Sequence, residues 1–147
     1  MKKAILVFVF LIGITSQAQN TEIQKTIATF FEGFHARDTI KIKSVCSDRM
    51  LLQSIAENAK GAKLSDESLK EFYTSIATIP ANFDFQEKIL SYSIQVDGTM
   101  AHAWTPYEFY INGKLSHKGV NAFTLFKENG SDASEWKIIY VIDTRRR

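Results

Sequence analysis

The chain has 147 residues, and 18 Lys and Arg against 16 Asp and Glu give a formal net charge of +2. This length suits one domain, alone or with a short leader. Apolar residues at 45% and charged residues at 23% are ordinary globular values and argue against a collagen, a coiled coil, a multispan membrane protein and a disordered tail. The charge is too small to indicate a nucleic-acid binder. One cysteine excludes an intrachain disulfide and a cysteine-cluster metal site.

Residues 1–18 have the pattern of a secretory signal peptide. The positive start Met1-Lys2-Lys3 precedes an apolar run over 4–14, and Ser16-Gln17-Ala18 supplies the small residues of a cleavage site. The run is about half of the ~20 residues that a membrane-spanning helix needs, and the alternative is a buried N-terminal helix. We expect cleavage after Ala18 and a mature domain over 19–147 in the periplasm or outside a bacterial cell. Loss of two lysines leaves 16 basic residues against 16 acidic ones, hence no net charge.

Two helices are predicted at the start of the mature domain. Apolar residues recur at helical spacing over 21–36, where Phe30 and Phe34 belong to a phenylalanine-rich face that we expect to be buried. Asp38 is a good N-cap for a second, short helix that ends near Ser47.

A strand and a third helix follow in the prediction. The strand covers 50–57, and a loop with two lysines and a glycine covers 59–64. Ser65 is the predicted cap of the third helix, because acidic residues in its first turn are favoured there. Pro80 ends that helix.

Beyond Pro80 the apolar period changes to two, which predicts strands. Asp97-Gly98 and Asn112-Gly113 are the preferred dipeptides of two-residue hairpin turns. The predicted strands cover 83–96, 99–111, 115–127 and 136–143. The resulting order, α-α-β-α-β-β-β-β, predicts an α+β domain with three helices on one face of a curved antiparallel sheet.

The turn at Asn112-Gly113 predicts the register of one hairpin, and the register sorts its side chains between two faces. Counting from Ile111 opposite Lys114 places Glu108 opposite His117 and Trp104 opposite Asn121. Four residues then share an outward face that a second subunit would cover: Trp104, His117, Asn121 and Phe123. The other face carries alanines at one end and bulkier side chains at the other, and we expect it to line a pocket under the helices.

Short motifs in a fixed order resemble the nuclear transport factor 2-like superfamily, which includes polyketide-cyclase-like (SnoaL-like), ketosteroid-isomerase-like and lumazine-binding-like proteins. The motifs span 21–147 and are Phe30-Phe31-Glu32-Gly33-Phe34-His35-Ala36-Arg37-Asp38, Leu69-Lys70-Glu71-Phe72-Tyr73, Ala103-Trp104-Thr105-Pro106-Tyr107-Glu108-Phe109, His117-Lys118-Gly119 and Trp136-Lys137-Ile138. The closing Asp143-Thr144-Arg145-Arg146 is similar to small secreted bacterial members of unsettled function. The resemblance implies a cystatin-like cone, a pocket between sheet and helices, and a homodimer.

The family's isomerases use an Asp base and an oxyanion hole made of a Tyr and a protonated Asp. In the resemblance, Phe30 takes the place of the Tyr and Ala122 that of the oxyanion Asp, while the base position falls near Glu57. Without donors aimed at the developing charge, the largest catalytic contribution is missing. We therefore reject isomerase chemistry of this type.

Several residues remain as weak catalytic candidates, each with a structural alternative. Glu108 and His117 could act as a carboxylate–imidazole base or form a cross-strand ion pair. Asp143 could point into the pocket mouth or pair with a basic residue at the rim, and Glu57 is the other acidic candidate. Arg145-Arg146-Arg147 could capture an anion or form a solvated basic tail.

Three further polar residues are interpreted as structural. We expect Cys46 to be a buried, inert thiol, Asp38 a helix cap, and His35 a partly buried surface residue. The three histidines lack the His-x-x-x-His spacing, so no metal site and no cofactor are expected.

The sequence thus predicts an exported domain that binds a small, partly apolar molecule, with no nucleic-acid partner and no membrane span. The predicted ligand-binding residues are Phe30, Phe34, Tyr92, Thr105, Tyr107, Phe109, Lys118 and Asp143. Two alternatives stay open: an enzyme of the polyketide-cyclase, isomerase or hydrolase type that uses a pocket carboxylate, and a protein-interaction module that acts through its sheet face.

Overall fold

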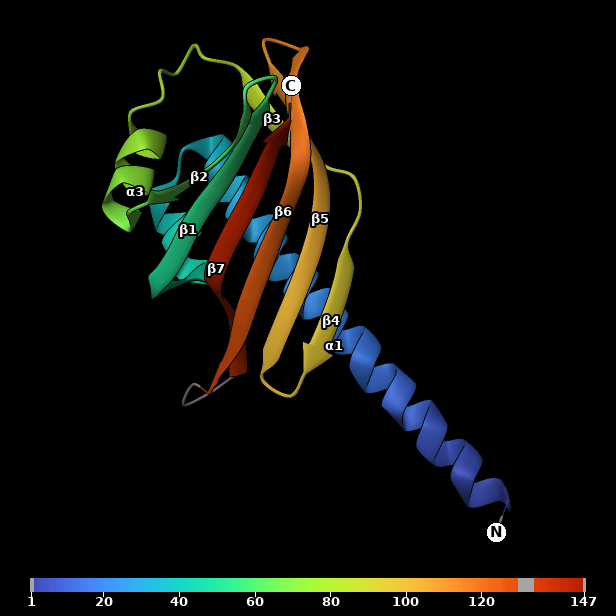
Figure 1. The fold of residues 1–147 in the computed structure, drawn as a ribbon. Coiled ribbons are helices and arrows are strands. Elements are labelled where there is room, and N and C mark those ends of the chain that lie inside the picture. The colour runs from blue at the N-terminus through green and yellow to red at the C-terminus, as the bar shows by residue number, and fades with distance from the viewer. Residues whose placement is uncertain (1, 130–133, 147) are drawn as a thin grey trace.

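The computed structural model describes residues 2–129 and 134–146, which form three helices and seven strands (Figure 1). In chain order they are α1 (Lys2–Ala36), α2 (Thr39–Val45), β1 (Cys46–Asn58), β2 (Gly61–Glu67), α3 (Leu69–Ala77), β3 (Phe85–Ile89), β4 (Ser93–Asp97), β5 (Met100–Ile111), β6 (Lys114–Asn129) and β7 (Ser134–Arg146). The predicted α+β fold class with three helices on a sheet is confirmed.

The strands form one curved sheet in the order β2-β1-β7-β6-β5-β3, and β4 also pairs with β5. All pairings are antiparallel except β1 with β7, so the sheet is mixed, whereas a purely antiparallel one was predicted. Figure 1 shows α1 lying across one face of this sheet, with α3 beside the β1–β2 end. That end is where the layers separate and where the cavity described below lies.

Helix α1 supplies the core with the apolar stripe that the sequence predicts. Ile23 and Ile27 are fully buried, and Phe30 and Phe31 both set their rings edge-on to Phe123 of β6, at centroid distances of 5.9 and 6.0 Å. The helix begins at Lys2, earlier than the predicted residue 21, and its N-terminal part extends past the sheet (Figure 1). Over residues 2–129 and 134–146, no helix has the length and apolarity to cross a membrane.

The corner between α1 and α2 is as predicted. The Asp38 carboxylate accepts the backbone N–H of Lys41 at 2.9 Å and so caps α2. Gly33 permits the close approach of the two helices, because a Cβ at that position would lie 2.8 Å from Cγ1 of Ile42.

The predicted loop over 59–64 and the predicted helix cap at Ser65 are wrong. Residues 61–67 form β2, which pairs with β1 from Asn58 opposite Gly61 to Leu52 opposite Glu67. Helix α3 is capped three residues later by Ser68. The reason is the capping box: the Ser68 hydroxyl accepts the N–H of Glu71, and the Glu71 carboxylate accepts the N–H of Ser68, whereas Ser65 has no acidic residue three positions on.

The predicted strand over 83–96 is also wrong in its middle, because it divides into β3 and β4. Both pair with β5, β3 with its C-terminal half and β4 with its N-terminal half. The break lies opposite Pro106, which accepts a backbone hydrogen bond from Leu90 at 2.9 Å but has no N–H to return.

The register of β5 against β6 follows the prediction for two pairs and then shifts. Ile111 pairs with Lys114 and Tyr110 with Leu115, but a bulge follows and Phe109 pairs with His117. The shift of one residue moves the later β6 side chains to the opposite face.

Asn121 and Phe123 consequently point toward α1 and are 6% and 0% exposed, so their predicted place on the outward dimer face is wrong. Lys118, predicted to line the pocket, lies opposite Glu108 and is exposed. Trp104 keeps its predicted outward position and is 49% exposed.

Two serines separate the observed cap from the predicted one. Replacement of Ser68 by Ala should lower the free energy of unfolding by about 1 kcal/mol, because the cap is lost. Replacement of Ser65 by Ala should change it by less than about 0.5 kcal/mol, since that exposed hydroxyl only donates to Ser54 O at 3.3 Å. Urea unfolding of both variants measures the difference, and the reverse order would contradict the position of α3.

Candidate functional site

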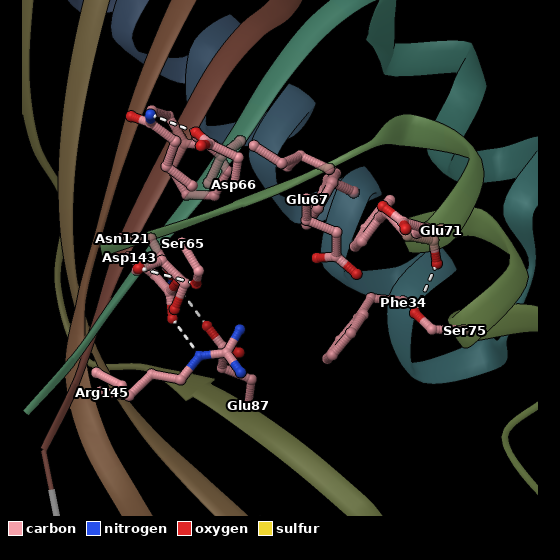
Figure 2. A pocket seen from close by; sticks show the side chains of 18 of the residues that line it. Phe34, Ser65, Asp66, Glu67, Glu71, Ser75, Glu87, Asn121, Asp143 and Arg145 are labelled. Atoms are coloured by element: carbon pink, nitrogen blue, oxygen red, sulfur yellow. Dashed lines mark hydrogen bonds and ion pairs between the residues drawn. The ribbon is translucent and has the colours of Figure 1, made fainter. Parts of the chain in front are cut away.

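A cavity of about 670 Å³ lies between α1, α3 and the concave face of the sheet. This volume falls within the range of small-molecule sites, roughly 300–1,000 Å³. Helix α1 supplies one side, the β1–β2 hairpin with α3 supplies a second, and β3, β6 and β7 supply a third. Figure 2 shows open space between Glu67 and Phe34 on one side and the group around Asp143 on the other.

The floor of the cavity is aromatic. Phe30, Phe31 and Phe34 of α1 line it together with Phe72 of α3 and Phe123 of β6. Phe30 lies parallel to Phe72 with their ring centroids 6.1 Å apart. Such rings offer a large apolar surface with a partly negative face, so the floor suits an apolar or aromatic body.

Glu87 of β3 contributes a carboxylate to the cavity lining. Its Oε1 accepts a hydrogen bond from Nδ2 of Asn121 on β6 at 2.6 Å. Burial raises the pKa of Glu87 to about 7, and the negative charge of Asp143 adds to the rise, while the Asn121 hydrogen bond and Arg145 oppose it. Glu87 therefore exists in both protonation states near neutral pH, as a general acid or base requires.

Asp143 and Arg145 are two residues apart on β7 and therefore share one face of the strand. The Arg145 Nε donates to Oδ2 of Asp143 at 2.7 Å. The Tyr107 hydroxyl lies behind them, 2.8 Å from the Thr144 carbonyl and 3.4 Å from Asp143 Oδ2. Burial raises the pKa of Tyr107, and Asp143 and Glu87 raise it further. Tyr107 thus stays protonated and holds this strand in place.

The β1–β2 hairpin forms the outer wall. Ser65 and Glu67 share a face of β2 and turn toward the cavity, whereas the Asp66 carboxylate accepts from Gln53 Nε2 at 2.7 Å and turns away (Figure 2). Burial raises the pKa of Glu67, with Glu71 and Asp143 adding to the rise and Arg145 opposing it. The Ser68 hydrogen bonds lower the pKa of Glu71.

Three of the eight predicted ligand-binding residues line this cavity, namely Phe30, Phe34 and Asp143. The other five do not: Tyr92, Thr105, Tyr107, Phe109 and Lys118. Thr105 is fully buried beneath the polar wall and donates to the Asn121 carbonyl at 3.2 Å. Tyr92 packs against the core, and Phe109 stacks on Phe85 with their ring centroids 6.1 Å apart.

The bulge places Lys118 opposite Glu108 and His117 opposite Phe109, so the predicted cross-strand position of the Glu108–His117 pair and the predicted outward position of His117 are wrong. The Glu108 carboxylate accepts from the Tyr110 hydroxyl at 2.6 Å, and the His117 ring stacks on Phe109 with their centroids 4.8 Å apart. Glu57 is exposed on β1 outside the cavity lining.

The residue expected at the oxyanion position is also displaced by the bulge. Ala122 faces away from α1, opposite Trp104, and Asn121 faces inward instead. The inward polar group of β6 is therefore an amide.

Cys46 is buried and His35 is partly buried, as predicted. The His35 Nε2 accepts the backbone N–H of Glu87 at 2.9 Å, and burial lowers the pKa of the imidazole. Burial also raises the pKa of the Cys46 thiol to about 12, so the thiol stays protonated and unreactive.

Glu67, Glu87, Asn121 and Arg145 line the cavity but were not predicted as ligand-binding residues. One signal was present in the sequence. Glu87 lies two residues from both Phe85 and Ile89, so this acidic residue shares a strand face with two apolar ones. Across residues 2–129 and 134–146, no group of three or more His, Cys, Asp or Glu side chains could hold a metal ion. The carboxylates surround a space instead of converging on a point.

The raised pKa of Glu87 makes stability depend on pH. Between its ordinary value of 4.5 and about 7, the folded protein keeps a proton that the unfolded chain has lost, so stability falls as pH rises through this window. Relative to Glu87→Gln, wild type should lose up to roughly 3 kcal/mol between pH 4 and 8. Urea unfolding across that range measures the change, with Glu128→Gln at an exposed position of β6 as the control. Parallel profiles for wild type and Glu87→Gln would contradict the buried position of Glu87.

Comparison with known proteins supports the fold and leaves the chemistry open. No protein-family model and no curated protein matches the chain. Solved structures do resemble it at low identity. A nuclear transport factor 2-like protein from Cytophaga hutchinsonii has a TM-score of 0.67 and 12% identity over 87% of this chain and 98% of that one.

Two further structures show the same arrangement. A protein of unknown function with a cystatin-like fold from Nostoc punctiforme has a TM-score of 0.65 and 14% identity, covering 86% of this chain and 90% of that one. A proposed dehydratase of the nuclear transport factor 2-like family from Streptomyces avermitilis has a TM-score of 0.61 and 15% identity, covering 90% and 99%. The chain therefore has the nuclear transport factor 2-like fold, as its sequence motifs predict.

Proposed function

We propose that this protein binds a small, partly apolar molecule in the cavity between α1 and the sheet. The observation that carries the proposal is the open space of about 670 Å³ beside the phenylalanines of α1. Phe30 and Phe34 line this space without filling it, and Tyr107 packs behind the wall. An apolar floor with a few placed polar groups is the usual character of a ligand site.

The leader supports export as part of this proposal. A positive start, an apolar run of signal-peptide length and small residues before position 19 favour cleavage after Ala18. The protein would then meet its ligand in the periplasm or outside the cell.

Acid–base catalysis is a second candidate function, and Glu87 is the observation that favours it. A carboxylate with a pKa of about 7, next to an amide donor and the Asp143–Arg145 pair, could take or give a proton at neutral pH. The resemblance to the proposed dehydratase from Streptomyces avermitilis is compatible with such chemistry. Asp143 is a weaker base candidate, because Arg145 already neutralises it at 2.7 Å.

The uncovered face of the sheet supports a further proposal, that two copies associate or that a partner protein binds there. Trp104, Met100 and Phe126 are 49%, 53% and 43% exposed and lie on the outward face of β5 and β6. Neighbouring apolar side chains on an open face mark interaction surfaces.

Ligand binding in the cavity can be tested with two tryptophan substitutions on one hairpin. Ala56 lines the cavity opposite Lys63, whereas Ala62 pairs with Glu57 and points to the other side of the hairpin. A panel of small molecules should include one that raises the Tm of wild type. Ala56→Trp should abolish that shift by filling the site, and Ala62→Trp should keep it.

The result that would overturn ligand binding in the cavity is a Tm shift that survives in Ala56→Trp. Incubating the protein with each compound of the panel also separates binding from catalysis. Mass spectrometry of each stabilising compound should recover it unchanged, and a product that forms with wild type but not with Glu87→Gln would establish the enzyme instead.

Association through the sheet face predicts a dimer in solution. Trp104→Ala should shift the sedimentation coefficient toward that of a monomer, because the largest apolar side chain of the face is removed. Ile40→Ala, at a residue 81% exposed on α2 and so away from this sheet face, serves as the control and should leave the dimer intact. A wild-type monomer, or a Trp104→Ala dimer of unchanged strength, would contradict this interface.

A further inference from the structure

The charges around the cavity are unequal. Glu67, Glu87 and Asp143 turn their carboxylates toward it from three strands, and Arg145 is the one basic residue of the lining (Figure 2). Glu71 adds a fourth carboxylate at the edge of α3. The aromatic floor lies directly across from these acidic groups.

The positive charge of Arg145 is partly compensated by the carboxylates around it. Its Nε is bound to Asp143 at 2.7 Å, and both Asp143 and Glu87 stabilise the guanidinium charge. Glu67 also lies within electrostatic reach of Arg145. One cation is thus shared among three carboxylates, so a carboxylate or phosphate entering the cavity would meet net repulsion.

From this placement we propose that the cavity selects a small organic cation, a protonated amine on an apolar or aromatic body. The body would lie on the phenylalanines of α1 and the ammonium group would face Glu67 and Glu87. This inference rests on the proposed ligand-binding function and adds the charge of the ligand to it. The absence of a metal-binding group among the described residues favours a bulky cation over a metal ion.

Two physical effects support the choice. Aromatic faces from which water is excluded attract ammonium groups, and they also pack against apolar surface. The raised pKa values of Glu67 and Glu87 show that burial and neighbouring negative charge disfavour their ionised forms. A bound cation would relieve that penalty, and it would lower the pKa of Glu87 again.

The structure gives this proposal a proton signature. The groups that face Glu87 are Asn121 on β6, Asp143 and Arg145 on β7 and the Tyr107 hydroxyl on β5, while His35 of α1 accepts its backbone N–H. Because Glu87 is partly protonated near pH 7, a cation that binds beside it should release a fraction of a proton. A neutral ligand should release none.

Three probes of one shape test the charge: 2-phenylethylammonium, 2-phenylethanol and 3-phenylpropanoate. Isothermal calorimetry at pH 7 should give the ammonium probe a Kd at least about tenfold below that of the alcohol, and no binding of the propanoate. The binding enthalpy of the ammonium probe should differ between phosphate and HEPES buffers, which differ in ionisation enthalpy. That difference should vanish in Glu87→Gln.

Matched variants separate the cavity from general acidity. Glu67→Gln should weaken the ammonium probe by about fivefold and leave the alcohol unchanged. Glu128→Gln on the exposed part of β6 should change neither. Circular dichroism checks that each variant is folded.

Equal or tighter binding of the alcohol or the propanoate would overturn the charge selection and leave the binding function standing. Failure of all three probes would also overturn it, and the compound panel with Ala56→Trp then decides separately whether the cavity binds anything. Ammonium binding that persists unchanged in Ala56→Trp would overturn it as well, because the cation would lie elsewhere.

Discussion

The register between β5 and β6 is the constraint on which the rest of the structure depends. The bulge beside Phe109 lets β6 gain one residue, and every side chain from there toward Phe126 changes face. Phe123 thereby meets Phe30 and Phe31, and Asn121 reaches Glu87 at 2.6 Å. Without the bulge, Ala122 and Thr124 would face α1, and both the aromatic core and the partner of the buried carboxylate would be lost.

The same shift explains why the sequence predicted the helical side of the site better than the sheet side. Helical spacing averages over many residues, so Phe30 and Phe34 were placed correctly by their periodicity alone. A strand face depends on parity, and a single extra residue reverses it. The turn at Asn112-Gly113 predicted the first two pairs correctly, but no feature of Ser116-His117 in the sequence predicts a β-bulge there.

The remaining errors come from pairing partners that are distant in sequence. Strand β2 has no buried side chain to create an alternating pattern, so its residues resembled a loop, and β1 alone makes them a strand. Pro106 interrupts the ladder of a neighbouring strand more than ten residues away. An acidic side chain at Glu87 is explained by the amide of Asn121, which lies beside it and donates a hydrogen bond to it. Arg145 was interpreted as part of a basic tail. In the structure it belongs to β7, which holds its side chain on the same face as Asp143.

Glu71 belongs both to the cavity lining and to the N-terminal cap of α3. Its carboxylate accepts both the hydroxyl of Ser68 at 2.6 Å and the backbone N–H of Ser68 at 3.1 Å, and it also stands at the edge of the cavity. The group that begins α3 is therefore one that an occupant of the cavity can reach. A ligand that draws this carboxylate away from Ser68 would bind more weakly, because loss of the cap would fray the first turn of α3. A ligand that leaves the cap in place would keep the helix as a rigid border, so the part of such a ligand near α3 would tolerate less variation in shape than the part near the phenylalanines.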